Sequence, residues 1–465
     1  MSVDKKLRAR YFKRCDPRES LPPEDDRNVF DDVVAKARGR DWVEVLADRI
    51  EVSELSGLKA CEFFTGLPGS GKSTELRRLE ARLEAPDSAH LLTVYIDADL
   101  VIDLYGTIDV TDVLMAILAR TEERVLKAEG KDSAIALQDG RLARFWHWLT
   151  TTEVALKGIE ASAGAEAGIP EVGKVSMGAK VVADLKTRPT LRATVRETLA
   201  NHVAPFVAKA REAMEELDDR AKARGYAGLA VIFDSLEKLQ GTTESWKAVL
   251  DSAERVFSRR AADLVLPVHV LYTIPMALIL RMRVPVTLLP MLKLFERNGT
   301  PAAGFEAARE IVRKRVPDEA LNTFFGPTNR EARLKRLIEW SGGYPREIVR
   351  LLQNCIAEPK LDEDLFTRIL SMAGDEYRRT VLASAYPWLA RVFLDKPDQI
   401  LDAEEHREMV DRLLQNNVLL GYLNGTLWFD VHPAVRTLSG VHAEIEKLKE
   451  KREIERLPKA EAAGG

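Results

Sequence analysis

The sequence predicts a three-layer α/β core followed by a helical lid domain and a C-terminal winged-helix domain. Three observations support this architecture. The apolar run Ala60 to Phe64 ends at a glycine-rich loop, and an amphipathic helix follows the loop. Four helical segments succeed one another between Phe305 and Ile356. Further helices then lead to two short apolar strands joined by Asn424 and Gly425, a strong hairpin signal.

Length and composition are those of a folded chain with several domains. The 465 residues exceed one ordinary core, and 46% hydrophobic with 31% charged residues is a globular composition. The net charge of -4 gives no general attraction to nucleic acid. Cys15, Cys61 and Cys355 are few and far apart, which predicts neither a disulfide framework nor a zinc site. Because the N-terminus lacks a hydrophobic signal stretch, we expect a cytoplasmic protein that does not enter a membrane.

Shifts in composition suggest where the domains begin and end. Residues 1–35 have scattered charges and a loose DPRESLPPEDD stretch, so we expect an extended arm. The core takes residues 36–300 and contains an insertion at about 130–225. In the insertion we expect a projecting β-hairpin over Ile159 to Leu185 and a helical stalk over Leu191 to Arg224. The remaining parts are the lid at 301–360, the winged helix at 361–443 and a charged tail at 444–465.

Within the core, apolar periodicity predicts alternating helices and strands. Helical spacing occurs at Asp41 to Ile50 and at Thr74 to Leu83. The predicted strands after the glycine-rich loop are Leu91 to Ile96, Leu229 to Phe233, Val268 to Thr273 and Val284 to Leu289.

The glycine-rich loop carries the most specific motif of the chain. Residues 66–74 read GLPGSGKST and match G-x-x-x-x-G-K-[ST] between a strand and a helix. In such a loop, backbone N–H groups surround the β-phosphate, Lys72 neutralises phosphate oxygens and the Ser73 hydroxyl ligates Mg²⁺. The sequence therefore predicts a P-loop NTPase core that binds ATP and Mg²⁺. The nucleotide-binding residues predicted in the loop are Gly66, Pro68, Gly69, Ser70, Gly71, Lys72, Ser73 and Thr74.

Two later strands end in polar residues. Asp234 follows the apolar run LAVIF and is the predicted Mg²⁺-linked carboxylate. Glu237 is predicted to orient and deprotonate the attacking water, the alternative being a surface carboxylate paired with Lys238. Thr273, which ends the next strand, is predicted to contact the γ-phosphate or the water. Its alternative role is a strand-end threonine with a locally satisfied hydroxyl.

One arginine of the lid has a motif-based assignment. The segment Gly342-Gly343-Tyr344-Pro345-Arg346 places a glycine turn and a helix-starting proline directly before Arg346. We expect this arginine to report the presence of γ-phosphate. The alternative is an ordinary surface arginine.

From about Arg38 to Thr437 the chain resembles the AAA+ and STAND ATPases, in particular origin-recognition-type AAA+ proteins and ATPases of bacterial conflict systems. The likeness rests on Gly39-Arg40 before a helix, GLPGSGKST, VIFDSLE, the strand ending at Thr273, GGYPR and the winged helix. It implies that Arg346 is sensor 2, that Thr273 is sensor 1 and that Gly39 and Arg40 line the adenine site.

The chain departs from the family pattern at two positions. Ser235 stands where AAA+ proteins commonly carry the catalytic Glu, and Lys238 stands where the STAND pattern prefers a second acid. The resemblance therefore implies slow hydrolysis. Efficient cleavage would need an arginine from a neighbouring subunit, because that charge stabilises the transition state. Arg281 and Arg283 are the first candidates, and the alternative is that they are solvated charges.

Three functions follow as hypotheses. The first is an AAA+/STAND-like ATPase whose nucleotide state controls oligomerisation and engagement of a protein partner, such as an effector of bacterial anti-phage defence. The second is a DNA-binding AAA+ initiator or loader, although the acidic helix predicted at Asp402 to Leu414 opposes it. The third is a nucleotide-locked scaffold without hydrolysis. The basic candidates for DNA contact are Arg330, Arg333, Lys335 and Arg336 in the lid and Lys5, Lys6, Arg8, Arg10, Lys13 and Arg14 near the N-terminus.

Overall fold

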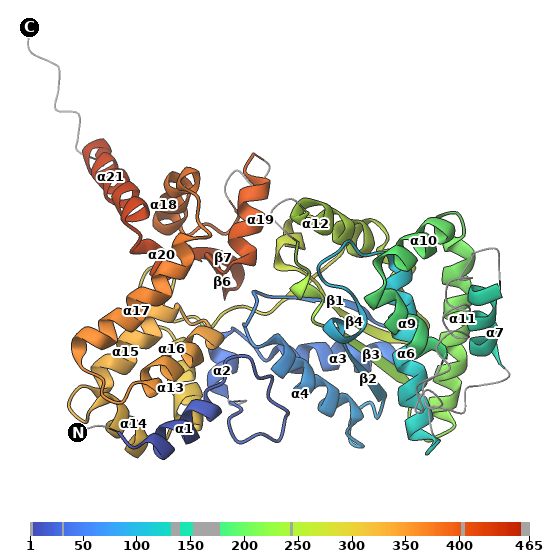
Figure 1. The fold of residues 1–465 in the computed structure, drawn as a ribbon. Coiled ribbons are helices and arrows are strands. Elements are labelled where there is room, and N and C mark those ends of the chain that lie inside the picture. The colour runs from blue at the N-terminus through green and yellow to red at the C-terminus, as the bar shows by residue number, and fades with distance from the viewer. Residues whose placement is uncertain are drawn as a thin grey trace, which may run out of the picture. The chain divides into compact units, whose positions relative to one another are not determined.

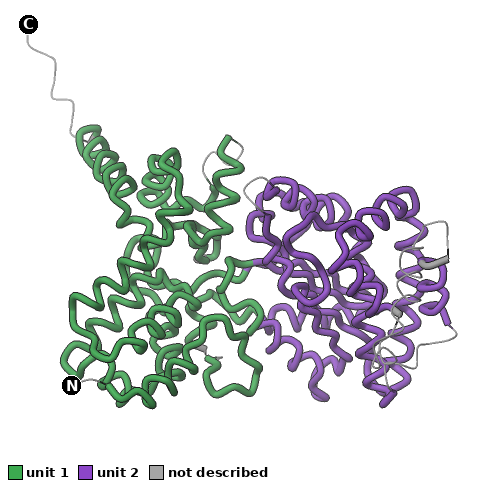
Figure 2. The backbone as a smooth tube through the Cα atoms, viewed as in Figure 1, with its two compact units in different colours: residues 1–42, 66–74, 289–465 green, residues 43–65, 75–288 purple. Residues whose placement is uncertain are grey.

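The computed structural model describes residues 3–29, 32–131, 140–151, 177–241, 245–400 and 405–456. Two compact units make up the chain (Figure 2). Unit 1 comprises residues 1–42, 66–74 and 289–465, and unit 2 comprises residues 43–65 and 75–288. The glycine-rich loop therefore belongs to unit 1 by its contacts, whereas the strand that precedes it belongs to unit 2.

Unit 2 is built on a five-stranded sheet whose paired strands are all parallel (Figure 1). The strand order is β2-β3-β4-β1-β5. All six residues of β3 are buried, as expected of a parallel strand with both faces covered. Phe233 pairs with Tyr272 and Phe64 pairs with Thr273, so β1, β3 and β4 end at the same edge. The strands are β1 (Cys61–Thr65), β2 (Leu92–Asp97), β3 (Leu229–Asp234), β4 (His269–Thr273) and β5 (Thr287–Leu288).

The α/β core predicted from the sequence is confirmed. Four strands lie within one residue of their predicted bounds, because apolar runs of this length fit a buried parallel strand. The predicted strand Val284 to Leu289 is only partly confirmed, since just Thr287 and Leu288 join the ladder.

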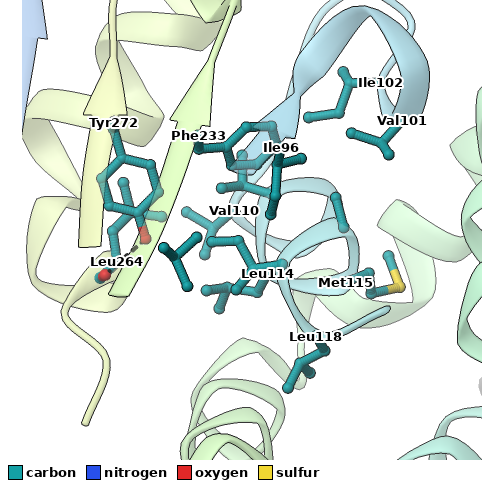
Figure 3. Close-up of a cluster of buried hydrophobic side chains, with 14 of the residues drawn as sticks. Ile96, Val101, Ile102, Val110, Leu114, Met115, Leu118, Phe233, Leu264 and Tyr272 are labelled. Carbon is teal, nitrogen blue, oxygen red and sulfur yellow. Dashed lines mark hydrogen bonds between the residues drawn. The ribbon is translucent and has the colours of Figure 1, made fainter. Parts of the chain in front are cut away.

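The largest apolar cluster packs helix α6 (Val110–Ala128) against the sheet. Figure 3 shows Val110 and Leu114 of α6 near Ile96 of β2 and Phe233 of β3. A hydrogen bond of 2.9 Å from the Tyr272 hydroxyl to the Leu264 carbonyl lies beside this cluster. Helix α6 begins with a capping box. The Asp109 carboxylate accepts a backbone N–H bond from the first turn, and the Asp112 carboxylate accepts the backbone N–H bond of Asp109.

The segment between β2 and β3 differs from the predicted insertion. Met177–Thr187 form a helix, α9, instead of the second half of a hairpin, and the other part of the predicted hairpin lies outside the described residues. Val181 and Leu185 of α9 are buried in the cluster around α6, so the described part of this segment does not project from the core as predicted. The predicted stalk consists of two helices, α10 (Pro189–Ala200) and α11 (Val203–Lys222). The chain leaves helical geometry between them, at Asn201 and His202.

The helices of unit 2 are mostly those expected from apolar periodicity. The predicted helix Asp41 to Ile50 is confirmed as α3, and the predicted helix after the glycine-rich loop is confirmed as α4. Besides α6 and α9 they are α3 (Trp42–Leu55), α4 (Lys72–Glu84), α5 (Ala98–Val101), α7 (Arg141–Thr151), α10 (Pro189–Ala200), α11 (Val203–Lys222) and α12 (Trp246–Glu254), with short helical turns at Leu236–Lys238, Arg255–Arg259, Ala261–Leu264 and Met276–Leu280.

The helical lid of unit 1 matches its prediction closely. Its four helices are separated at Val316-Pro317, at Gly326 and at Gly342-Gly343, the breaks expected from the sequence. Gly326 and Gly342 have φ angles of 77° and 63°, a region that glycine adopts without strain. The lid helices are α13 (Gly304–Arg315), α14 (Asp318–Phe325), α15 (Arg330–Ser341) and α16 (Pro345–Ala357).

The N-terminal residues are not the extended arm that the sequence suggested. Residues Lys5–Arg14 form helix α1, and Asp4 caps it by accepting the backbone N–H bonds of the second and third helical residues at 2.9 and 3.0 Å. Tyr11 packs edge-on against Phe324 of the lid with a centroid distance of 5.8 Å, and Cys15 is fully buried there. The apolar spacing that supports α1 was obscured by its many charges. A second short helix, α2 (Asp32–Ala37), follows.

The C-terminal part of unit 1 has the helices and hairpin expected of a winged helix. Strands β6 and β7 pair antiparallel around Gly425, which has a φ angle of 76°, so the predicted hairpin is confirmed. No described helix has both the length and the apolar character needed to cross a membrane. The elements are α17 (Glu363–Arg378), α18 (Tyr386–Asp395), α19 (Arg407–Gln415), β6 (Leu419–Asn424), β7 (Thr426–Val431), α20 (Pro433–Arg436) and α21 (Ser439–Arg456).

Candidate functional site

The loop 66–74 has the backbone geometry of a phosphate-binding loop. Gly69 and Gly71 have φ angles of 81° and 99°, which other residues adopt only with strain. Helix α4 begins at Lys72, directly after the second of these glycines. The first N–H groups of an α-helix have no acceptor within the helix, so they are available to an anion in front of it.

The polar atoms of this loop suit phosphate oxygens. The Ser70 hydroxyl is buried and has no hydrogen-bond partner among the described residues, so it offers an unused donor. Lys72 is only 3% exposed, and its ammonium group donates to the carbonyls of Gly66 at 2.9 Å and Leu67 at 3.2 Å. A buried ammonium group at the start of α4 is placed where it can bind anionic oxygens. The loop therefore fits a nucleotide phosphate.

Arg38 contacts the glycine-rich loop, although no motif in the sequence had pointed to this residue. Its guanidinium is buried and donates to the Ser70 carbonyl at 2.6 Å. A Cβ atom on Gly71 would lie 3.3 Å from the same guanidinium. The neighbouring residues Gly39 and Arg40, predicted to line the adenine site, are exposed, and Arg40 lies over the Trp42 ring at 5.1 Å. Their adenine contact stays a prediction.

The lid contacts the loop through the segment that the sequence had identified. A Cβ atom on Gly69 would lie 2.7 Å from the Tyr344 ring and hydroxyl and 2.8 Å from Cβ of Arg346. Glycine at position 69 is thus required both by its φ angle and by this close approach. The Arg346 side chain is exposed at the start of α16, next to the loop. This position is compatible with the predicted sensor role, which stays a prediction.

The winged helix also reaches the loop, through Asn417 in the turn between α19 and β6. The Asn417 amide donates to the Pro68 carbonyl at 3.2 Å and to the Tyr344 hydroxyl at 3.1 Å. Asn417 is buried and has a φ angle of 54°, which asparagine tolerates better than most residues. Burial raises the pKa of Tyr344 to about 12, so its hydroxyl keeps its proton at neutral pH. No motif in the sequence had pointed to Asn417.

In unit 2, the sheet edge presents Asp234 at the end of β3. The carboxylate is 1% exposed and accepts a hydrogen bond of 2.5 Å from the Tyr95 hydroxyl of β2. Burial, and then the charge of Asp234, raise the pKa of Tyr95, so the phenol stays a donor. The Arg77 guanidinium lies 3.4 Å from the centre of the Tyr95 ring. Asp234 is therefore fixed in position, as a metal-linked carboxylate should be.

The backbone turns sharply directly after Asp234. Ser235 has a φ angle of 70°, which is unusual for a residue other than glycine. Such strain is concentrated at functional sites, because surrounding structure must hold it in place. The turn leads into Leu236–Lys238, where Glu237 is buried at 5% exposure. The alternative reading of Glu237 as a surface carboxylate is therefore wrong, while its catalytic role stays a prediction.

Thr273 holds this turn. Its hydroxyl accepts the Leu236 N–H at 3.0 Å and donates to the Phe233 carbonyl at 3.3 Å. Strand β4 lies between β1 and β3, so Thr273 ends the strand between those that lead to the loop and to Asp234. The hydroxyl is satisfied locally, which favours the alternative given for it in the sequence. A positioning role for Thr273 is better supported than direct contact with phosphate.

The two candidate arginine fingers have different environments. The Arg281 side chain is 7% exposed and forms ion pairs with Asp251 at 3.0 Å and Glu254 at 3.3 Å. A guanidinium held in this way is not available to a neighbouring subunit without losing both pairs. Arg283 is exposed, and its backbone N–H donates to the Ser258 hydroxyl at 3.1 Å; its guanidinium pairs with no carboxylate among the described residues. Of the two arginines predicted to act on a neighbouring subunit, Arg283 therefore remains the candidate.

Comparisons with known proteins give distant structural likenesses. No protein-family model and no curated protein sequence matches the chain. The structure of the ORC2 protein of Aeropyrum pernix, in ADPNP and ADP complexes, is 14% identical with a TM-score of 0.40, covering 97% of this chain and all of the other. The ORC1 protein of Aeropyrum pernix in complex with DNA is 12% identical with a TM-score of 0.31, covering 93% of this chain and 98% of the other.

A third solved structure, Cdc6p from Pyrobaculum aerophilum, is 12% identical with a TM-score of 0.27 and covers 96% of this chain and 99% of the other. With TM-scores below 0.5, none of these likenesses carries an argument about this chain. The functional assignment rests instead on the motifs and contacts of the chain itself.

Proposed function

We propose that the chain is an AAA+/STAND-like ATPase that binds ATP with Mg²⁺, hydrolyses it slowly and uses its nucleotide state to control oligomerisation and engagement of a protein partner. One observation supports this most directly. The phosphate-binding loop contacts Tyr344 of the lid and Asn417 of the winged helix. Any change of the loop on phosphate binding therefore acts on both of these domains.

Nucleotide binding is assigned to the loop and its neighbours. Lys72 and the N–H groups at the start of α4 would hold the phosphates, and Ser73 and Asp234 would hold Mg²⁺, which supplies charge neutralisation when it is bound. We infer that Ser73 and Asp234 act on the same nucleotide, because their two motifs follow each other in this order in the chain.

Hydrolysis is assigned to Glu237 as the group that accepts a proton from the attacking water. Its carboxylate follows the strained turn at Ser235, and Thr273 holds that turn through the Leu236 N–H. The spacing of Asp234 and Glu237 leaves the position directly after Asp234 without a carboxylate. We therefore infer that turnover is slow until a neighbouring subunit supplies Arg283.

DNA binding is the weaker alternative. In the lid, Arg333 is buried and pairs with Glu363 at 3.3 Å, and Arg336 pairs with the same carboxylate. Arg330 pairs with Glu331 at 2.8 Å. Each of these three arginines has a protein carboxylate beside it, which weakens its attraction for a phosphate backbone. We therefore propose a protein as the partner rather than DNA. That this protein is an effector of phage defence rests only on the resemblance to ATPases of bacterial conflict systems.

Calorimetry with the Lys72→Ala variant tests the assignment of the nucleotide site. A hydrogen bond to a charged group contributes about 1.5–3 kcal/mol, so we expect ATP affinity to fall on the order of ten- to hundredfold. Lys127→Ala, an exposed lysine on α6, is the control and should bind ATP as the parent does. Equal ATP affinity of the Lys72→Ala variant and the parent would exclude the loop as the phosphate site.

A further inference from the structure

A cavity lies within unit 1, between the lid and the winged helix. Its volume is about 520 Å³, within the range that holds small molecules. Helices α15 and α17, strands β6 and β7 and the turn that begins α20 line it. It contains none of the residues assigned above to the phosphates, the Mg²⁺ ion or the attacking water, so the proposed ATPase activity does not use it.

Aromatic side chains form part of the walls of this cavity. Trp340 of α15 and Trp428 of β7 both line it, as does Tyr422 of β6. The rings of Tyr422 and Trp428 lie 4.8 Å apart at 34°, so they pack against each other in the wall. Leu294 and Leu370 add aliphatic surface. Walls of this kind favour a flat ring system, because ring faces stack well against indole.

Two of the residues that line the cavity also carry hydrogen-bond donors that the described residues do not use. The Nε1 atoms of Trp340 and Trp428 are buried and have no hydrogen-bond partner among the described residues. Trp428 as a whole is only 2% exposed. Buried N–H groups are almost always paired, so two such donors at one cavity indicate a missing acceptor. The Tyr422 hydroxyl is not such a donor, since it already bonds to the Gly342 carbonyl at 2.5 Å.

The charges around the cavity leave one cation in surplus. Three cationic side chains, Arg336, Lys396 and Arg436, line the cavity together with two carboxylates, Glu339 and Asp430. Within this set Arg436 pairs with Asp430 at 2.9 Å, whereas Lys396 lies 3.8 Å from that carboxylate.

Residues beyond the lining account for the remaining charges. Glu363 pairs with Arg336, and Lys335 lies 3.8 Å from Glu339. Lys396 is therefore the cation with the weakest claim on a protein carboxylate. Its ammonium group also lies 5.8 Å from the centre of the Trp428 ring, so a ligand stacked on that ring would be near it.

We propose that this cavity binds a small heteroaromatic monoanion. The ring would stack against the indoles, its acceptor atoms would take the Nε1–H bonds of Trp340 and Trp428, and its single negative charge would face Lys396. A neutral ring would leave Lys396 with only its long contact to Asp430. A triphosphate carries several negative charges where the lining offers one, so ATP fits the glycine-rich loop better than this cavity.

Two matched ligand pairs test the charge requirement on the full chain. Indole-3-carboxylate is compared with indole, and cyclic 3′,5′-AMP with adenosine, because each pair differs by one negative charge on the same ring. Binding is measured by calorimetry. We expect at least one of the two anions to bind at least tenfold more tightly than its neutral counterpart. The indole pair tests a simple aromatic acid, and the adenine pair tests a phosphodiester.

Variants then locate the binding. Lys396→Gln should remove the preference for the anion and leave the weak binding of the neutral ring, whereas Lys360→Gln, at an exposed lysine between α16 and α17, should change neither. Trp340→Phe keeps the apolar wall but removes the N–H donor, and it should weaken the bound anion at least fivefold. Trp246→Phe of α12, whose Nε1 is also buried without a partner, is the matched control in unit 2.

Nuclear magnetic resonance of the indole groups gives a readout that does not depend on the variants folding. The chain has seven tryptophans, so seven indole N–H signals are expected. Titration of the parent with the tighter anion should move the Trp340 and Trp428 signals and slow their hydrogen exchange, since both gain an acceptor. The proposal is overturned if no anion binds more tightly than its neutral partner, or if the Trp340 and Trp428 signals stay unchanged at saturation. ATP affinity, measured in parallel, reports the glycine-rich loop separately.

Discussion

The glycine-rich loop in unit 1 and the sheet edge in unit 2 carry the two sets of predicted nucleotide contacts, and different parts of the chain hold them. Asn417 bonds to Pro68 across 349 positions of sequence, and Tyr344 of the lid packs on Gly69. At the sheet edge, Thr273 bonds to the Leu236 N–H across 37 positions, between neighbouring parallel strands. The sheet edge is therefore positioned by strand register, and the loop is positioned by contacts from other domains.

This difference leads us to assign hydrolysis to the sheet edge and the control of nucleotide binding to the residues that brace the loop. Asp234 ends a buried strand and Glu237 is buried in the turn that follows it, which suits groups that must keep a fixed geometry. The loop is braced by side chains of the lid and winged helix, and we propose that these contacts change with the bound nucleotide. Changes at the sheet edge should thus alter the rate of hydrolysis, whereas changes at the bracing residues should alter binding.

The largest effect is expected from Arg283, the arginine that we assign to a neighbouring active site. Arg283→Ala should lower turnover on the order of a thousandfold with nearly unchanged ATP affinity, because a finger stabilises only the transition state. Mixing this variant with Lys72→Ala should restore part of the activity, since one composite site is then complete. Turnover is measured by phosphate release at several protein concentrations.

Arg255→Ala, an exposed arginine elsewhere in unit 2, is the control for this experiment and should keep the parental rate. If Arg283→Ala turns over normally, and specific activity is constant on dilution to monomer, the site is complete within one chain and the trans assignment is wrong.

At the sheet edge, Glu237→Gln should separate binding from chemistry. The amide keeps hydrogen-bonding atoms but cannot accept the proton, so hydrolysis should fall about a hundredfold or more while ATP affinity stays within about threefold. Single-turnover measurements give the rate, and calorimetry gives the affinity. Glu62→Gln on β1, a carboxylate paired with Arg49, is the control. Unchanged hydrolysis would mean that another group activates the water.

The bracing of the loop is tested by Asn417→Gly, which keeps the φ angle of 54° accessible and removes both amide bonds. We expect nucleotide to dissociate several-fold faster, because the loop loses a fixed partner, while the single-turnover rate with saturating ATP stays nearly unchanged. Stopped-flow release of a fluorescent nucleotide measures this rate.

Asn416→Gly is the matched control for the bracing experiment. This neighbouring amide is exposed and bonds only to the Arg412 carbonyl of its own helix, at 2.8 Å. If Asn416→Gly and Asn417→Gly release nucleotide at the same rate, the winged helix does not brace the loop, and the comparison between the two regions loses its basis.

Local patterns in the sequence determined much of the fold. The apolar runs of β1 to β4, the breaks of the lid helices and the hairpin at Gly425 all depend on neighbouring residues, so they were predicted correctly. The position of the loop GLPGSGKST between a strand and a helix was also predicted correctly, whereas its binding of phosphate stays a prediction. The wrong expectations, the extended arm and the described part of the hairpin, concern α1 and α9, where charges or small residues obscured helical spacing.

Only the tertiary structure decided which side chains brace the loop and which arginine is exposed. Arg38 and Asn417 lie in no motif, and their roles arise because distant segments pack against the loop. Arg281 and Arg283 are two positions apart and equivalent in the sequence, yet Asp251 and Glu254 hold only the first. A local pattern specifies the conformation of a segment, because its causes lie within a few residues. Burial and long-range hydrogen bonds depend on what the fold brings together, so no single segment encodes them.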